Sequence, residues 1–126
     1  MNVLIDTSVW VEHFRRPDAR LQQLLRIDAA ITHPLVILEL TCGTPPGRTR
    51  TLGDLALLRH TGLAPHDEVG GLVERERLFG PGCGAVDCTL LASTMLTPET
   101  QIWTSDLRLA RLADRFGVRY TYAGSQ

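Results

Sequence analysis

Val3-Leu4-Ile5-Asp6-Thr7-Ser8 is the stretch that decides the fold class of this 126-residue chain. Its first three residues form a short, continuous apolar run, which is the pattern of a parallel strand buried on both faces. The run ends at Asp6, so a carboxylate is expected at the carboxyl end of the strand. Thr7 or Ser8 can then cap a helix that continues to about Phe14. A strand that leads directly into a helix is typical of α/β proteins.

Strand-like and helix-like segments alternate along the rest of the chain. Further strands are expected at residues 29–32, 62–64, 101–104 and 118–120, and helices after Pro17 and at residues 35–41, 51–58, 67–78, 85–95 and 107–116. This order predicts a three-layer α/β/α sandwich with a central parallel sheet of four to five strands. In such sheets the functional crevice lies outside the carboxyl ends of the strands. Asp6 and Asp106 both fall there.

Length and composition indicate one folded domain over residues 1–126. A chain of this size can bury a core, and a hydrophobic content of 44% excludes a disordered protein. The N-terminus lacks the pattern of a signal peptide, and no apolar stretch is long enough to span a membrane. The three cysteines show no metal-ligand spacing and fit reduced thiols. We therefore expect a cytoplasmic protein without a membrane partner.

The net charge of −1 gives no strong nucleic-acid signature, but the distribution of charge is informative. All 13 basic residues are Arg, which binds phosphate bidentately. If four acidic residues form a metal site, the remaining ten leave the rest of the chain at +3. That balance is compatible with RNA binding once cations neutralise the site.

Four carboxylates have unusual settings. Asp6 and Asp106 each lie at a strand-to-helix junction, Asp87 follows a glycine-rich loop at a helix start, and Glu39 lies between Leu38 and Leu40 in an apolar helix. Each Asp alone can be read as a helix cap. Together, carboxylates that converge at strand ends repel one another, and a divalent cation relieves the repulsion. An oxygen-only ligand set favours Mg²⁺ (or Mn²⁺), and two such ions can stabilise both oxygens of a phosphodiester hydrolysis.

The motifs around these carboxylates resemble those of PIN-domain proteins, in particular VapC-type toxins of toxin–antitoxin pairs. The resemblance covers essentially the whole chain and is carried, in order, by Leu4-Ile5-Asp6-Thr7-Ser8-Val9-Trp10, Val36-Ile37-Leu38-Glu39-Leu40, Asp87-Cys88-Thr89-Leu90-Leu91-Ala92-Ser93 and Ile102-Trp103-Thr104-Ser105-Asp106. It implies a metal-dependent endoribonuclease that is the toxin of a type II toxin–antitoxin system. Its substrate would be RNA (tRNA or rRNA), its partner a cognate antitoxin, and its oligomeric state a homodimer.

The resemblance also implies roles for individual residues. Asp6 would be the central metal ligand, Asp87 and Asp106 would complete the metal sites, and Glu39 would bind metal or orient the attacking water. Ser8 and Thr104 would hold carboxylates in place through hydrogen bonds. Three arginines recur at helical spacing and are candidates for RNA contacts, although a solvated helix face explains them equally well: Arg108, Arg111 and Arg115.

Two further readings concern the early helix and the activity. The apolar run Val9-Trp10-Val11 with Phe14 exceeds what a short amphipathic helix needs, which indicates a partner surface, unless these residues fill the core.

A haloacid-dehalogenase-like phosphatase needs a second Asp at position 8, where Ser8 stands. A catalytically weakened PIN-like module that binds RNA or protein is the alternative, because Arg108 stands where the family often has an acidic or polar residue. The presence of all four carboxylates argues against that alternative.

Overall fold

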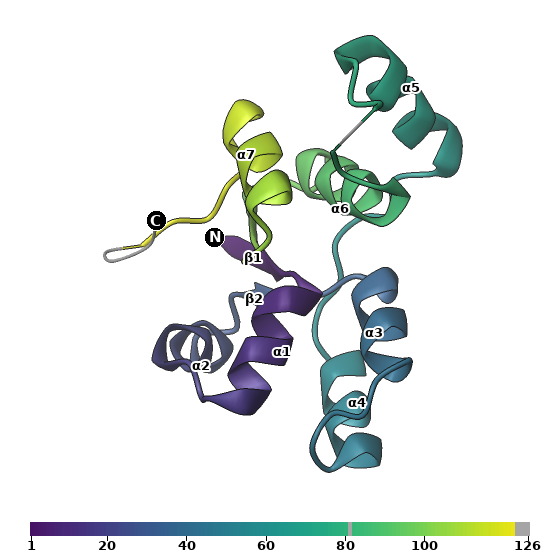
Figure 1. Ribbon diagram of the computed structural model, residues 1–126. Coiled ribbons are helices and arrows are strands. Elements are labelled where there is room, and N and C mark those ends of the chain that lie inside the picture. The colour runs from purple at the N-terminus through teal and green to yellow at the C-terminus, as the bar shows by residue number, and fades with distance from the viewer. Residues whose placement is uncertain (81, 123–126) are drawn as a thin grey trace.

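Strand β1 (Asn2–Ile5) is the central strand of the sheet. A computed structural model describes residues 1–80 and 82–122, and its sheet has the strand order β2-β1-β3 (Figure 1). Both neighbours, β2 (Ala30–Ile31) and β3 (Thr100–Trp103), run parallel to β1. The register places Val3 opposite Ala30 and Ile5 opposite Trp103. The expected α/β class with a parallel sheet is therefore confirmed.

Seven helices connect and cover these strands in the described part of the chain. They are α1 (Thr7–Arg15), α2 (Ala19–Arg26), α3 (Pro34–Thr41), α4 (Arg48–Ala56), α5 (His66–Glu76), α6 (Ala85–Leu96) and α7 (Leu107–Arg115). In Figure 1, α1 and α2 lie on one side of the strands, and α6 and α7 lie on the other. Within residues 1–80 and 82–122, no helix has both the length and the apolar character needed to cross a membrane.

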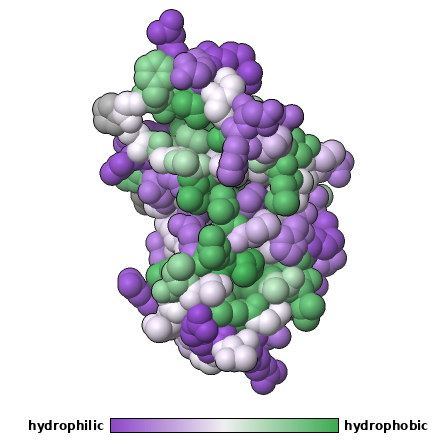
Figure 2. Space-filling view, turned by 90° about the vertical axis from the view of Figure 1, so that its right-hand side faces the viewer, coloured by the Kyte–Doolittle hydropathy of each residue, from purple (hydrophilic) through white to green (hydrophobic). Residues whose placement is uncertain are grey.

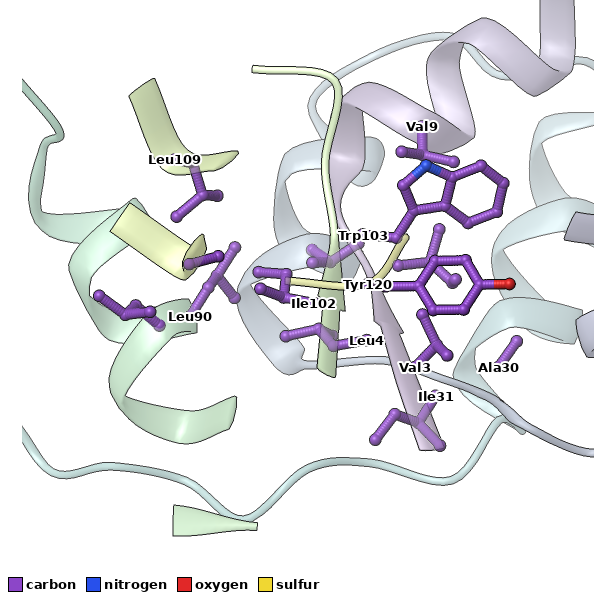
Figure 3. Close-up of a cluster of buried hydrophobic side chains, with 14 of the residues drawn as sticks. Val3, Leu4, Val9, Ala30, Ile31, Leu90, Ile102, Trp103, Leu109 and Tyr120 are labelled. Carbon is purple, nitrogen blue, oxygen red and sulfur yellow. The ribbon is translucent and has the colours of Figure 1, made fainter. Parts of the chain in front are cut away.

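The core packs against both faces of β1. Val3, Leu4 and Ile5 have no exposed surface, as the continuous apolar run predicts. Figure 3 shows Leu4 and Ile102 directed toward Leu90 of α6 and Leu109 of α7, whereas Val3 and Trp103 lie on the side of Val9 and Tyr120. This division follows from the alternation of side chains along a strand. It places helices on each face of the sheet.

The expectation of four to five strands is wrong for the described residues, in which the sheet has three. Residues 62–64 form no strand, because the backbone N–H of Gly62 donates to Thr97 Oγ1 at 2.9 Å instead of to a neighbouring strand. Pairing at that edge is reduced to a single bridge between Thr32 and His60. Residues 118–120 likewise make one bridge, between Ile102 and Arg119. Residues 118–120 touch the sheet edge for too short a distance to extend it, and the bridge at the other edge lies before residues 62–64.

The apolar residues of α1 fill the core. Val9 and Trp10 are each only 3% exposed, and Phe14 is partly buried and stacks on Trp10 at a ring-centroid distance of 6.1 Å. Val11 alone reaches the surface, with 37% exposure. The interpretation that this apolar run forms a partner surface is therefore wrong. Its alternative is confirmed, because Val9 and Trp10 belong to the hydrophobic core and Phe14 packs against it.

Candidate active site

The site begins where β1 and β3 end side by side. The backbone N–H of Asp6 donates to the carbonyl of Trp103 at 2.9 Å, which holds the carboxyl ends of the two strands together. Asp6 is 6% exposed, and its Oδ2 accepts hydrogen bonds from Ser8 Oγ and Thr104 Oγ1, each at 2.7 Å. A buried carboxylate is costly unless it is hydrogen-bonded or paired, and these charge-assisted bonds meet that requirement. Since both donors use Oδ2, Oδ1 is available for a further ligand.

The same two hydroxyls organise the loop that leads to Asp106. Thr104 Oγ1 accepts from the backbone N–H of Asp106, and Ser8 Oγ accepts from that of Ser105, each at 3.0 Å. Asp106 then caps α7, because its Oδ1 accepts from the N–H groups of Arg108 at 2.8 Å and Leu109 at 3.1 Å. The capping interpretation of Asp106 is correct for one oxygen, and the exposed carboxylate retains the other for the site.

Glu39 approaches the site from α3. Thr7 Oγ1, on the first residue of α1, donates to Glu39 Oε1 at 2.7 Å. Glu39 and its neighbour Leu38 are exposed, while Val36 and Leu40 are buried, so Glu39 lies on the outer side of the helix and not in the core. Its position among apolar residues in the sequence therefore involves no buried, unpaired charge.

Asp87 lies in the first turn of α6 and experiences the other three carboxylates. Burial and the charges of Asp6, Asp106 and Glu39 raise the pKa of Asp87 from its usual value of 3.8 to about 6, against a smaller opposing effect of Arg108. Gly84 is the N-cap of α6, and Asp87 is the third residue of the helix. A helix start normally lowers the pKa of an acid, but burial and the neighbouring charges outweigh that effect for Asp87. The structure therefore brings Asp6, Asp106 and Glu39 close enough for their charges to act on Asp87.

The hydroxyl contacts correct one expectation and add one residue. Neither Thr7 nor Ser8 caps α1, because Asp6 occupies the N-cap position and both hydroxyls turn to carboxylates instead. Sequence reasoning placed Ser8 and Thr104 near the site but assigned Thr7 only to capping. A hydroxyl residue directly after Asp6 was the available signal.

The three arginines of α7 have different surroundings. Arg108 lies near enough to the cluster to act on Asp87, and its Nη1 donates to the carbonyl of Gly82 at 3.3 Å. Arg115 forms an ion pair with Glu76 of α5 at 3.0 Å and lies over the ring of Phe116 at 4.9 Å. Arg111 is exposed. Arg115 thus already joins α7 to α5, and RNA contacts by these residues stay a prediction.

The donor set fits a hard divalent cation. All four charged candidates supply oxygen, the preference of Mg²⁺ and Mn²⁺. Among residues 1–80 and 82–122, no three His, Cys, Asp or Glu side chains are close enough to hold one ion together. The carboxylates therefore repel one another without being in coordination geometry.

Comparison with known proteins identifies the family. A model of the PIN domain matches residues 3–115, which include all four carboxylates. The chain belongs to the PIN domain family. Two relatives, both called Ribonuclease VapC32, come from the CDC 1551 / Oshkosh and ATCC 25618 / H37Rv strains of Mycobacterium tuberculosis. Each is 48% identical over 116 residues, which cover 92% of this chain and 94% of the relative. The VapC-type PIN resemblance inferred from the motifs is thereby confirmed.

Proposed function

We propose that this PIN domain protein is a metal-dependent endoribonuclease and the toxin of a type II toxin–antitoxin system. The observation that carries the proposal is the cluster of four carboxylates at the carboxyl ends of β1 and β3, in which burial and the charges of the other three raise the pKa of Asp87 to about 6. The 48% identity to proteins called Ribonuclease VapC32 supports RNA as the substrate class. The substrate is tRNA or rRNA.

Asp6, Glu39, Asp87 and Asp106 would hold one or two Mg²⁺ or Mn²⁺ ions. Bound there, the cations would activate water and stabilise charge on the attacking and leaving oxygens. Asp6 would be the central ligand, since it is buried and keeps Oδ1 available. Glu39 binds metal or orients the attacking water. Ser8 and Thr104 fix the orientation of Asp6, and Thr7 fixes that of Glu39.

A cognate antitoxin would inhibit the enzyme by placing a cationic side chain among the carboxylates. Arg pairs with carboxylates bidentately, so an inserted Arg would displace the metal. Excess Mg²⁺ should then weaken the complex, and neutralising Asp6 or Asp106 should weaken it too. The cytoplasm is the proposed compartment, because the three cysteines are free thiols and fit a reducing environment.

A homodimer is part of the same proposal, with its contact surface away from α1. Figure 2 views the side of the molecule that carries α3 to α6 and shows apolar groups gathered across it. Exposed apolar side chains on these helices and their loops include Leu38, Leu57, Leu63, Met95 and Leu96, from 41% to 85% exposed. Light scattering after size-exclusion chromatography tests this part: a monomer at tens of micromolar would contradict it.

The deciding experiment is cleavage of a panel of purified tRNAs and rRNA with Mg²⁺, with mapping of the product ends. Water activated at a metal site leaves a 5′-phosphate and a 3′-hydroxyl, whereas attack by the RNA 2′-hydroxyl leaves a cyclic phosphate. Asp6→Asn should be folded and inactive, and the exposed Asp67→Asn is the matched control with wild-type activity. If the wild-type protein cleaves none of these RNAs yet binds them, the weakened binding module is the correct reading.

A further inference from the structure

A pocket of about 420 Å³ lies between α1, α3 and the loop after α3. It is within the range of about 300–1,000 Å³ that small-molecule sites occupy. Thr7 and Glu39 line it, and these are the two residues whose side chains meet at 2.7 Å beside the carboxylate cluster. The pocket is therefore continuous with the candidate active site.

We propose that this pocket binds the nucleoside adjacent to the bond that is cleaved, and that it determines where the RNA is cut. The proposal rests on the proposed ribonuclease function and adds a substrate subsite to it. RNA whose scissile phosphate lies at the carboxylates would present its neighbouring nucleoside at Thr7 and Glu39, which line the pocket. The continuity of the two sites favours part of the substrate as the occupant.

The lining of the pocket suits the flat face of a base. Val11 and Phe14 of α1, Leu40 of α3 and the loop residues Pro45 and Pro46 supply apolar surface. The Phe14 ring is held by stacking on Trp10, with an interplanar angle of 26°. Bases stack on aromatic rings in proteins that bind unpaired RNA, and each such contact is sequence-tolerant. Splayed-out single-stranded or loop nucleotides are therefore the form of RNA that fits.

The outer wall of the pocket is held in place by hydrogen bonds. The Arg48 side chain donates to the carbonyls of Thr41 and Gly43, and Thr51 Oγ1 donates to the carbonyl of Pro46. Pro46 and its neighbour Pro45 also restrict the backbone of this wall. The cavity is thus formed before any ligand arrives, which lowers the entropic cost of ordering a nucleoside in it.

Arg15 lines the far part of the pocket and supplies the opposite charge to the cluster. Thr7 and Arg15 are the first and last residues of α1, about 12 Å apart by helical rise. Arg15 is exposed and forms no ion pair within residues 1–80 and 82–122. A nucleoside between the carboxylates and Arg15 therefore places its next phosphate toward a guanidinium, which binds phosphate bidentately.

The test uses an RNA oligonucleotide with one mapped cleavage site and a series in which single bases are replaced by abasic ribose. For the wild-type protein, kcat/KM should fall about 10-fold when the base on one side of the cleaved bond is absent. Removing a base at a more distant position should change kcat/KM little. Val11→Trp fills the pocket from a residue that is already 37% exposed. This variant should cleave intact RNA about 10-fold more slowly and show no further loss with the abasic RNA. Ile27→Trp, at a residue that is 55% exposed and outside the pocket, is the control and should behave as wild type.

Arg15→Gln gives an independent readout. It should raise KM and reduce the salt dependence of RNA binding by about one phosphate contact, without changing the effect of the abasic position. Thermal unfolding of each variant confirms that the fold is intact.

The other possible results contradict the nucleoside subsite, or show whether the subsite or the ribonuclease function has failed. Equal loss at all abasic positions contradicts the subsite while leaving the ribonuclease intact. If Val11→Trp cleaves normally but escapes inhibition by the antitoxin, the pocket binds protein and the proposal is wrong. If the wild-type protein cleaves no RNA, the ribonuclease function fails, and an abasic series made on the RNA that binds with the highest affinity is then read by RNA binding. Position-dependent binding then supports the subsite, and uniform or absent binding refutes it.

Discussion

Replacing Asp87 by Asn should make the metal-free protein more stable at neutral pH. Folding raises the pKa of Asp87 from 3.8 to about 6, so the folded protein favours the protonated carboxyl and is penalised when the group is charged. A tenfold change in proton affinity is about 1.36 kcal/mol, so the full penalty is about 3 kcal/mol. Solvent screening of this partly buried group and its favourable place at a helix start reduce the expected gain to about 1–2 kcal/mol.

The pH dependence of this effect has a definite sign. For the wild-type protein, the contribution of Asp87 to stability is greatest below about pH 4 and is lost as the pH rises through about 6, because the unfolded chain releases its proton first. Most of the difference between variant and wild type should therefore disappear near pH 4.5. Urea unfolding in EDTA at pH 7.5 and pH 4.5 measures it. Asp67→Asn, in the first turn of α5, is the control: it loses only the helix-start effect and should lower stability by less than about 1 kcal/mol.

Addition of Mg²⁺ should reverse the order of stability. The wild-type protein gains stability by binding the cation to its folded state, whereas Asp87→Asn, which lacks one ligand, gains much less. The reasoning would be refuted if Asp87→Asn were no more stable than wild type in EDTA at pH 7.5. An equal gain of both proteins on addition of Mg²⁺ would also remove Asp87 from the metal site.

Four further outcomes follow from the site. Asp6→Asn should reduce RNA cleavage to background in a gel assay while circular dichroism stays native; normal turnover would exclude Asp6 as a ligand. Thr104→Val, which removes the hydroxyl that donates to Asp6, should lower Mg²⁺ affinity or activity about 10–100-fold, and calorimetry would detect no change if that bond were unimportant. Wild-type cleavage should vanish in excess EDTA and return with Mg²⁺ or Mn²⁺, so persistence in EDTA would contradict a metal mechanism. Arg108→Ala should tighten Mg²⁺ binding, because a positive charge near Asp87 is removed, and should raise KM for RNA, because a phosphate ligand is lost. If Mg²⁺ affinity and RNA affinity both rose or both fell, Arg108 would not have this role.

The centre of the fold was predictable because its pattern has few interpretations. Val3-Leu4-Ile5 has no polar residue to face water, so the strand must be covered on both faces, and all three residues have no exposed surface. The edges were not predictable. Residues 62–64 and 118–120 have strand-like composition, but their pairing depends on where tertiary contacts direct the backbone, as the bond from Gly62 to Thr97 illustrates.

The candidate site was predictable in outline and less so in its contacts. Asp6 and Asp106 could be placed together because the carboxyl ends of parallel strands meet at one edge. The partners of Thr7 and Ser8 could not, since a hydroxyl at a helix start can either cap the helix or donate to a neighbouring carboxylate. The second is a charge-assisted bond and prevails here. The burial of Trp10 likewise depended on how closely α1 packs on the sheet.

The pairing of β1 with β3 determines when during synthesis the site can form. Asp6 is translated long before Thr104, which donates to it and lies 98 residues later in the chain. A growing chain that has not reached Thr100 lacks both the second neighbour of β1 and one of the four carboxylates, Asp106. A ribosome-bound fragment therefore has no assembled cluster. The cluster of four carboxylates can therefore assemble only after residues 100–106 have been translated and have left the ribosome.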